Sequence, residues 1–182
     1  MNTFEKTLGF NEKMRKPAHK IIKSIFDEYY QDQFKVEKLN SLELDKEASI
    51  DSKVESLTTK VNFSIQEKYR TNDKLVFGDF TQELYNDFGG ENQTDGEFKH
   101  LWADFYFYGW TNKAETDFVS FFVMDIKEYK QLVQRAGGLS KLPGAASQVN
   151  AAYGKALFYS IPLPTLKPAM FAWSQSLDHI FK

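Results

Sequence analysis

The sequence predicts an α/β protein in which helices flank a mixed central sheet of four to five strands. Three observations lead to this class. Residues 61–70 alternate between apolar and polar side chains, which is the period of a half-buried strand. Residues 18–30 repeat apolar side chains at helical spacing. Asp125 and Glu128 form the capping-box pattern that begins a helix.

The first expected element is a helix from Pro17 to Tyr30. Proline suits the first turn of a helix, where its missing N–H has no intrahelical partner to lose. Ile22, Ile25 and Phe26 then follow at helical spacing. Residues 1–16 are polar and rich in lysine and arginine, so we expect them to form a loose N-terminal arm or a solvated helix face.

Two neighbouring strands are expected next. Residues 34–44 alternate only partly and predict a first strand or an irregular lead-in. Residues 49–55 and 60–70 are separated by a short polar connector, and such strands pair most simply as an antiparallel hairpin. This pairing would bring Asp51 beside Gln66 and Lys68 on one polar edge.

The second half of the chain repeats a strand pair followed by a helix. Residues 75–80 are expected as a strand, and residues 86–97 as a glycine-rich mobile loop or a plain connector. Residues 98–110 and 117–124 are aromatic and apolar, which indicates an antiparallel pair, with one helical turn before the first strand. A helix from Asp125 to Arg135 should then end at Gly137-Gly138.

The last part is expected as a C-terminal appendage over residues 139–182. It begins with a stretch rich in glycine, alanine and serine, interpreted as a flexible linker or a second loop. A short strand at residues 157–161, a proline-interrupted stretch and a closing helix at residues 170–181 follow. At 182 residues the chain fits one ordinary domain, so we expect a single domain over residues 1–182.

Composition narrows the classes of function. The chain has no cysteine, which excludes disulfides and thiolate–zinc sites, and His19, His100 and His179 lack metal-ligand spacing. No phosphate-binding glycine loop and no serine-elbow sequence is present. The formal net charge of −2 argues against a broad electrostatic nucleic-acid footprint. The first ten residues show no apolar signal region, so a cytoplasmic protein that does not engage a membrane is expected.

The residues around Asp51 carry the clearest chemical pattern. A carboxylate, an amide oxygen and an ammonium at one point are suited to holding a hard divalent cation next to a phosphodiester. Asp51 followed by the Gln66-Glu67-Lys68 triplet resembles the PD-(D/E)XK nuclease superfamily, whose fold is called restriction-endonuclease-like. The order of the expected elements resembles the αβββαβ core of that superfamily. Gln66 departs from the pattern, because aspartate or glutamate is usual there, and makes this a Gln-x-Lys variant.

The resemblance implies a set of roles. Asp51, the Gln66 side-chain oxygen and the Glu67 backbone carbonyl would hold Mg²⁺ or Mn²⁺, and Lys68 would orient the attacking water. Arg70 and Lys53 would contact phosphates of the substrate. Rivals for the acidic role are Asp45, Glu47, Glu55 and, from the first helix, Glu28, each of which is otherwise explained as surface charge.

The expected function is therefore that of a metal-dependent nuclease, a hydrolase acting on phosphodiester bonds in DNA. The resemblance makes DNA the expected partner and leaves a homodimer open. The alternative is a non-catalytic phage or mobile-element protein that uses a nuclease-like fold for binding, and the neutral Gln66 favours this alternative while Lys68 favours the enzyme.

Overall fold

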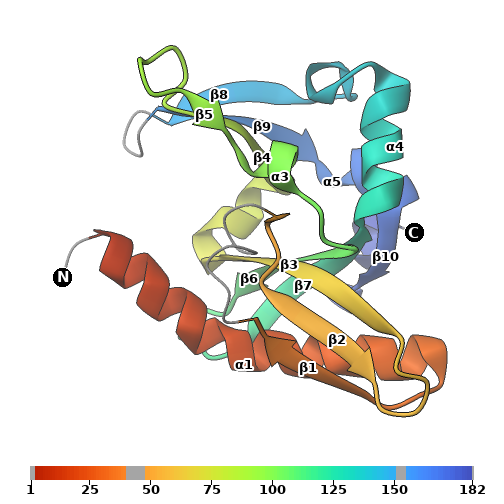
Figure 1. Ribbon diagram of the computed structural model, residues 1–182. Helices are drawn as coiled ribbons and strands as arrows, with labels where there is room; N and C mark the ends of the chain where they lie inside the picture. Colours follow the sequence, from red (N-terminus) through yellow and green to blue (C-terminus); the bar gives the residue numbers. More distant parts are fainter. Residues whose placement is uncertain (1–2, 40–47, 151–154, 182) are drawn as a thin grey trace.

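The computed structural model describes residues 3–39, 48–150 and 155–181, so Asp45 and Glu47 lie outside the described residues. The helices are α1 (Thr3–Tyr30), α3 (Glu97–His100), α4 (Ile126–Ala136), α5 (Leu163–Leu166) and α6 (Asp178–Phe181). The strands are β1 (Phe34–Lys38), β2 (Ser52–Ser56), β3 (Asn62–Arg70), β4 (Asp79–Asn86), β5 (Thr94–Asp95), β6 (Phe105–Thr111), β7 (Phe118–Asp125), β8 (Ala146–Asn150), β9 (Ala156–Pro162) and β10 (Met170–Trp173). Figure 1 shows their arrangement.

A six-stranded mixed sheet forms the centre of the protein, in the order β1-β2-β3-β6-β7-β10. Strands β1, β2 and β3 form an antiparallel meander, β6 then runs parallel to β3, and β7 and β10 are antiparallel additions. The predicted mixed α/β class is confirmed. The sheet has one strand more than the four to five expected, because β10 adds to the edge beside β7.

A second sheet of four strands covers part of the first, in the order β5-β4-β9-β8. Strands β4 and β9 pair in antiparallel register over most of their length although about 80 residues separate Phe80 from its partner Ile161. Residues 139–182 are therefore not an appendage, since β8 and β9 complete this sheet and β10 joins the central one. The segment after Gly138, expected as a linker, contains β8.

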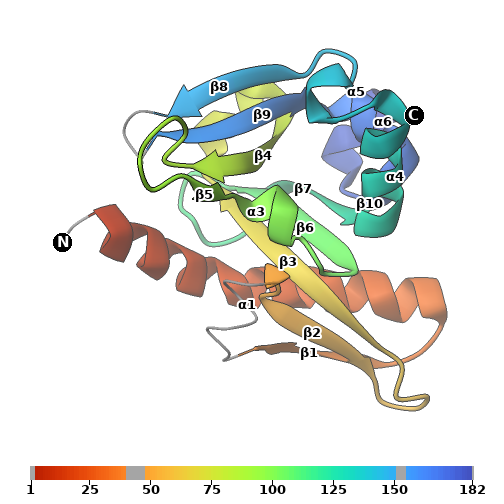
Figure 2. The ribbon, with the colours of Figure 1, turned by 45° about the horizontal axis from the view of Figure 1, so that its top comes forward.

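Helix α1 packs on one face of the central sheet and is far longer than expected (Figure 2). Met14, Ala18, Ile22 and Phe26 are fully buried and recur at every fourth position. Pro17 lies inside the helix, where a proline costs about 3 kcal/mol. Burial of Met14 alone contributes about 1.5–3 kcal/mol. Packing of the buried face thus offsets the cost of the proline, and the helix continues on both sides of it. The expected loose arm is therefore wrong for the described residues 3–16.

The other face of the central sheet carries the second core. Tyr106, Tyr108 and Trp110 of β6 are buried there against Phe80 of β4 and Tyr129 of α4. The rings of Phe80 and Tyr129 meet edge to face, with centroids 5.7 Å apart. Three layers result, with α1, the central sheet, and the second sheet with α4 stacked in that order (Figure 1).

Several local predictions are confirmed. Helix α4 begins at Asp125, whose side chain accepts a hydrogen bond from the Glu128 backbone N–H, and it ends at Gly137 in the left-handed conformation. Helix α3 is the helical turn expected before β6. The strand expected at residues 75–80 instead lies at residues 79–86 as β4, and most of the expected segment belongs to a 3₁₀ helix over residues 72–77. Residues 170–181 were wrongly expected as one helix, since they begin with β10.

The helices in the described part of the chain range in length from the four residues of α3 to the 28 of α1. None of them combines the length and the apolar composition needed to cross a membrane.

Candidate functional site

The candidate site begins where β2 meets β3. Ser52 pairs with Ile65 in an antiparallel register, so Asp51 stands opposite Gln66. The Asp51 N–H donates to the Ile65 carbonyl at 2.9 Å, and the Glu67 N–H donates to the Asp51 carboxylate at 2.8 Å. The expected juxtaposition of Asp51 with the Gln-x-Lys triplet is therefore present in the structure.

Alternation along β3 sorts its side chains onto two faces. Gln66, Lys68 and Arg70 share the face of Tyr106, Tyr108 and Trp110, to which they are paired in parallel register. This face looks toward β4 and α3. Glu67 points to the opposite face, toward α1, while its backbone N–H points to Asp51. Because the N–H and C=O of one strand residue point to the same side, the Glu67 carbonyl also faces the Asp51 edge.

Lys68 is held by the second sheet. Its Nζ lies 3.1 Å from Glu97 Oε2 and donates to the Thr81 carbonyl at 3.3 Å. Glu97 is anchored in turn, because Gln82 Nε2 donates to Oε2 at 3.1 Å and the Tyr106 hydroxyl donates to Oε1. The side chains of Lys68 and Glu97 are 27% and 14% exposed, so this ion pair is largely withdrawn from water.

Two amide oxygens at this place have no hydrogen-bond partner in the part of the chain that the structure describes. Both Gln66 Oε1 and Gln82 Oε1 are buried and unpaired. The orientation of the Gln82 amide is fixed by the donation of its Nε2 to Glu97, so its oxygen cannot be exchanged with its nitrogen. Unpaired buried acceptors are costly and uncommon, and one accepted explanation is an ion at the site.

The second expected phosphate-binding residue, Arg70, lies two residues further along the same face. Its Nε donates to the Tyr108 hydroxyl at 2.9 Å, and its Nη2 donates to Thr81 Oγ1. No carboxylate contacts its guanidinium within the described residues. Among the described residues, the partly buried guanidinium of Arg70 therefore hydrogen-bonds to neutral hydroxyls rather than to a carboxylate.

Lys53 shares the sheet face of Asp51 but is engaged elsewhere. Its Nζ lies 3.3 Å from Glu55, which also lies 3.3 Å from Lys35. These ion pairs hold the pKa of the Glu55 carboxyl below its ordinary value, with the hydrogen bond from Lys35 as the largest cause. Glu55, a rival for the acidic role, is thus neutralised on β2 and does not contact Lys68.

Glu67 has a separate environment on the α1 face. Its side chain is only 2% exposed and accepts hydrogen bonds from the Ser52 and Tyr69 hydroxyls, while His19 Nε2 lies 3.0 Å away. Burial, and next the neighbouring Glu67 charge, raise the pKa of Tyr69 well above its ordinary value, so this hydroxyl stays protonated and donating. The carboxylate ties β2, β3 and α1 together.

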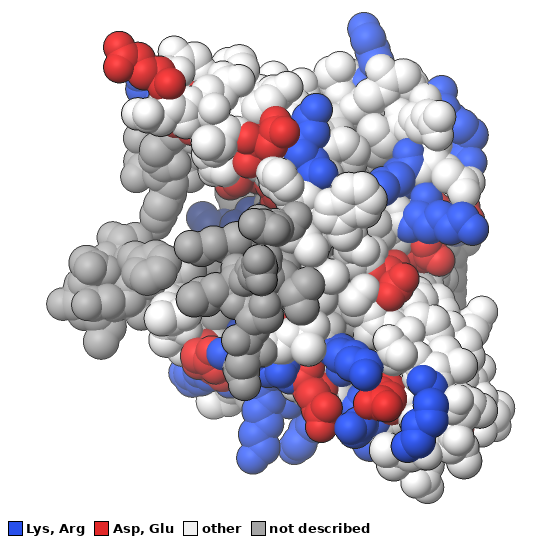
Figure 3. Space-filling model, viewed as in Figure 1, with Lys and Arg blue, Asp and Glu red and all other residues white. Residues whose placement is uncertain are grey.

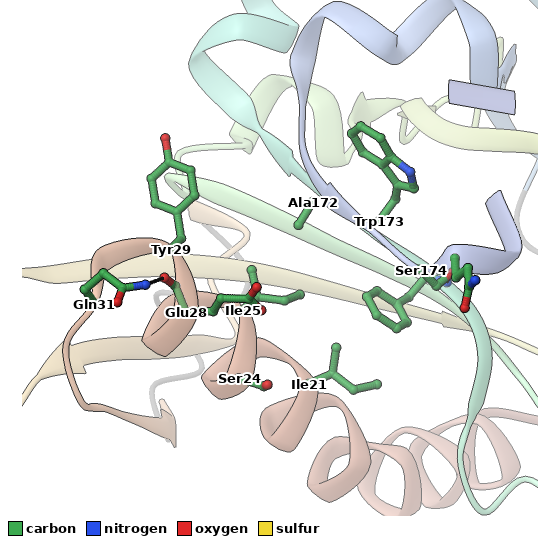
Figure 4. A pocket seen from close by; sticks show the side chains of 11 residues that line it. Ile21, Ser24, Ile25, Glu28, Tyr29, Gln31, Ala172, Trp173 and Ser174 are labelled. Atoms are coloured by element: carbon green, nitrogen blue, oxygen red, sulfur yellow. Dashed lines mark hydrogen bonds between the residues drawn. The ribbon is translucent and has the colours of Figure 1, made fainter. Parts of the chain in front are cut away.

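Glu28 is not brought to the candidate site. It lines a pocket of about 770 Å³ between α1 and β10, together with Ile25, Tyr29 and Trp173 (Figure 4). None of Asp51, Gln66 and Lys68 lines this pocket. This pocket therefore lies apart from the residues that carry the chemistry, and Glu28 is the one carboxylate among the residues that line it.

The oxygen atoms at the candidate site suit a hard cation that needs few ligands from the protein. Within the described part of the chain, no group of three or more histidine, aspartate or glutamate side chains is placed to hold a metal ion. Mg²⁺, however, is commonly held by one or two carboxylates with waters and substrate phosphates. Asp51 and the unpaired Gln66 oxygen meet that requirement.

Figure 3 shows the surface around this region. Basic and acidic side chains alternate along the lower part of this view rather than forming a single-sign patch. The face seen in Figure 3 therefore carries no extended electrostatic field of one sign.

Sequence reasoning missed the partners supplied by the crossover between β3 and β6. Glu97, Gln82 and Thr81 belong to segments expected as loop or as unassigned chain, yet all three contact Lys68 or each other. The available signal was weak. Gly96 is followed at once by an acid, and a Cβ at Gly96 would lie 2.8 Å from the Leu84 backbone carbonyl carbon, so glycine alone lets α3 approach β4.

Comparison with known proteins gave one structural similarity. No protein-family model matches the sequence, and no curated protein matches it. Among solved structures, the chain is similar to the crystal structure of restriction endonuclease MspI in complex with its cognate DNA. The two are 9% identical, the alignment covers 78% of this chain and 77% of that one, and the TM-score is 0.43.

Proposed function

We propose that this protein is a metal-dependent nuclease that hydrolyses phosphodiester bonds in DNA. The observation that carries the proposal is the placement of Asp51 opposite Gln66, with Lys68 on the same sheet face. The order α1, β1, β2, β3 reproduces the beginning of the αβββαβ core that the motif implies. The unpaired Gln66 oxygen supports a cation at the site, because it is an acceptor with no other use.

Each residue has a role in this proposal. Asp51, Gln66 Oε1 and the Glu67 carbonyl are the ligands of Mg²⁺, or of Mn²⁺ in its place. The bound cation supplies Lewis-acid polarisation of the phosphate and favours deprotonation of the attacking water. Lys68 orients that water and stabilises the negative charge that develops on the phosphate oxygens.

Arg70 and Lys53 position the DNA backbone. Arg70 is proposed to bind a phosphate next to the scissile one, since a guanidinium can donate two parallel hydrogen bonds to it. Lys53 would contact a phosphate further along β2 after leaving Glu55. Both contacts are to phosphate, so they give orientation rather than sequence preference.

The test is cleavage of single-stranded, duplex and branched DNA with Mg²⁺ or Mn²⁺, and with a chelator in a parallel arm. The wild type should cleave at least one form only when the metal is present. Lys68→Ala should lose cleavage, whereas Lys141→Ala, which removes an exposed lysine, should retain it.

A null result would support the other function. If neither the wild type nor Gln66→Glu binds a divalent cation or cleaves any DNA form, the catalytic proposal is wrong. The non-catalytic binding protein of a phage or mobile element then becomes the better account, and the neutral Gln66 is the feature that favours it.

A further inference from the structure

Glu97 brings a carboxylate to the candidate site, where the motif residue Gln66 carries no charge. The motif position on β3 is Gln66, which is neutral. Glu55 is already paired with Lys35 and Lys53, so Asp51 is the carboxylate of the β2–β3 hairpin that remains for a cation on this face. Glu97 comes from α3, on the crossover between β3 and β6, and its carboxylate directly contacts Lys68. Glu97 therefore approaches the candidate site from α3 rather than from the β2–β3 hairpin.

Hydrogen bonds show how Glu97 is placed relative to the motif. Tyr106 is paired in register with Gln66 on the adjacent strand, and its hydroxyl donates to Glu97 Oε1. Burial and then Glu97 raise the pKa of Tyr106 far above its ordinary value, and Asp51 contributes to the same shift. The hydroxyl therefore keeps its proton and holds Glu97 beside the row that Asp51, Gln66 and Tyr106 form across neighbouring strands.

A second, independent feature points to a ligand at this place. Gln82 is 0% exposed, its Nε2 is bound to Glu97, and its Oε1 has no partner within the described ranges. Gln66 Oε1, on β3, likewise has no partner among the described residues. One of these acceptors belongs to an amide bound to Glu97, and the other belongs to the residue opposite Asp51. Together with the two carboxylates they form a set of oxygen donors whose common partner would be a cation.

We infer that Glu97, with Gln82, is the second wall of the divalent-cation site and supplies the carboxylate that Gln66 does not. This inference rests on the proposed function for the identity of the cation. In the structure the charge of Glu97 is taken by Lys68, so cation binding and the Lys68–Glu97 ion pair compete for one carboxylate. Binding of the cation releases the Lys68 ammonium toward the phosphate.

Calorimetric titration of Mn²⁺ into the full chain, without DNA, tests this inference. Glu97→Gln should weaken binding at least about tenfold, the lower end of what removal of a supporting group costs a metal site. Asp95→Asn makes the same charge change two residues away at an exposed position and should leave the affinity unchanged. Adding Gln66→Glu to Glu97→Gln should restore much of the lost affinity.

A second pair of variants separates a cation-binding role from mere neutralisation of Lys68. Lys68→Met should tighten Mn²⁺ binding, because it frees Glu97 and removes a repelling charge. If Glu97 belongs to the cation site, Lys68→Met/Glu97→Gln loses that gain and binds more weakly than Lys68→Met. If Glu97 only neutralises Lys68, the two variants bind equally, and the inference is overturned.

The outcomes also distinguish this inference from the proposed function. Equal affinity of the wild type and Glu97→Gln overturns the role of Glu97 and leaves the nuclease proposal standing. Absence of Mn²⁺ binding by the wild type and by Lys68→Met overturns both. Thermal unfolding of each variant checks that a lost affinity does not come from a lost fold.

Discussion

The carboxylate of Asp51 accepts a hydrogen bond of 2.8 Å from the backbone N–H of Glu67, just before β2 begins and where β3 continues past it beside β6. The same side chain is the expected anionic ligand of the cation. Asp51 thus fixes the edge of β3 and carries the charge of the site, and the two contributions can be separated by substitution.

Asp51→Asn should abolish metal-dependent cleavage while leaving the fold in place. The asparagine oxygen can still accept the Glu67 N–H, so the backbone contact survives, but the negative charge is gone. Divalent-cation affinity should fall with activity, as calorimetry can measure. The exposed Asp95→Asn, with the same loss of charge, is the matched control. Retained cleavage in Asp51→Asn would show that another residue carries the role.

Gln66→Glu should tighten divalent-cation binding and preserve or raise cleavage. The substitution places a charge where a neutral oxygen now lies buried without a partner, and a cation site gains affinity with each charged ligand. Without metal the same change should lower thermal stability, because it adds a buried carboxylate near Asp51 and Glu97. A rise in Tm on adding Mn²⁺ that exceeds the rise for the wild type is the expected signature.

The sequence was sufficient for the local part of this geometry. The alternation over Asn62–Arg70 predicts β3 and the face shared by Gln66 and Lys68, since a period of two is fixed by strand geometry alone. The capping residue Asp125 predicts the start of α4, because the side chain bonds only three residues away.

The long-range part could not be read in the same way. Pairing of β4 with β9 places Gln82 and Glu97 over Lys68, and no local pattern encodes a partner 80 residues distant. Pro17 predicted a helix start, but the buried stripe through Met14 overrides it. The apolar run that begins at Met170 fits either a strand or a helix by its period. It forms a strand because it pairs with the edge of β7, a long-range contact that the local pattern does not contain.

Glu67→Gln should destabilise the protein by about 1–3 kcal/mol and leave divalent-cation affinity nearly unchanged. The buried carboxylate accepts from the Ser52 and Tyr69 hydroxyls, and an amide cannot accept with its nitrogen, so one buried donor loses its partner. Denaturant unfolding measures the change, with the exposed Glu91→Gln as control. A fall in cation affinity without a fall in stability would instead place the Glu67 side chain in the cation site.

Glu83→Gln should become more stable than the wild type as the pH rises. Burial on β4 is the largest cause that raises the pKa of the Glu83 carboxyl, the Glu97 charge adds to it, and Lys68 opposes it. A carboxyl whose folded pKa is raised contributes its stability below the unfolded pKa, near 4.5, and loses it as the pH rises through the folded value. Glutamine carries no such proton, so the difference in unfolding free energy between the two proteins should grow from pH 4 to pH 7.

Urea unfolding at both pH values measures this difference, and Asp95→Asn, exposed on the neighbouring β5, should show no comparable trend. A difference that stays constant over this range would mean that Glu83 titrates normally and faces water rather than the Lys68–Glu97 pair.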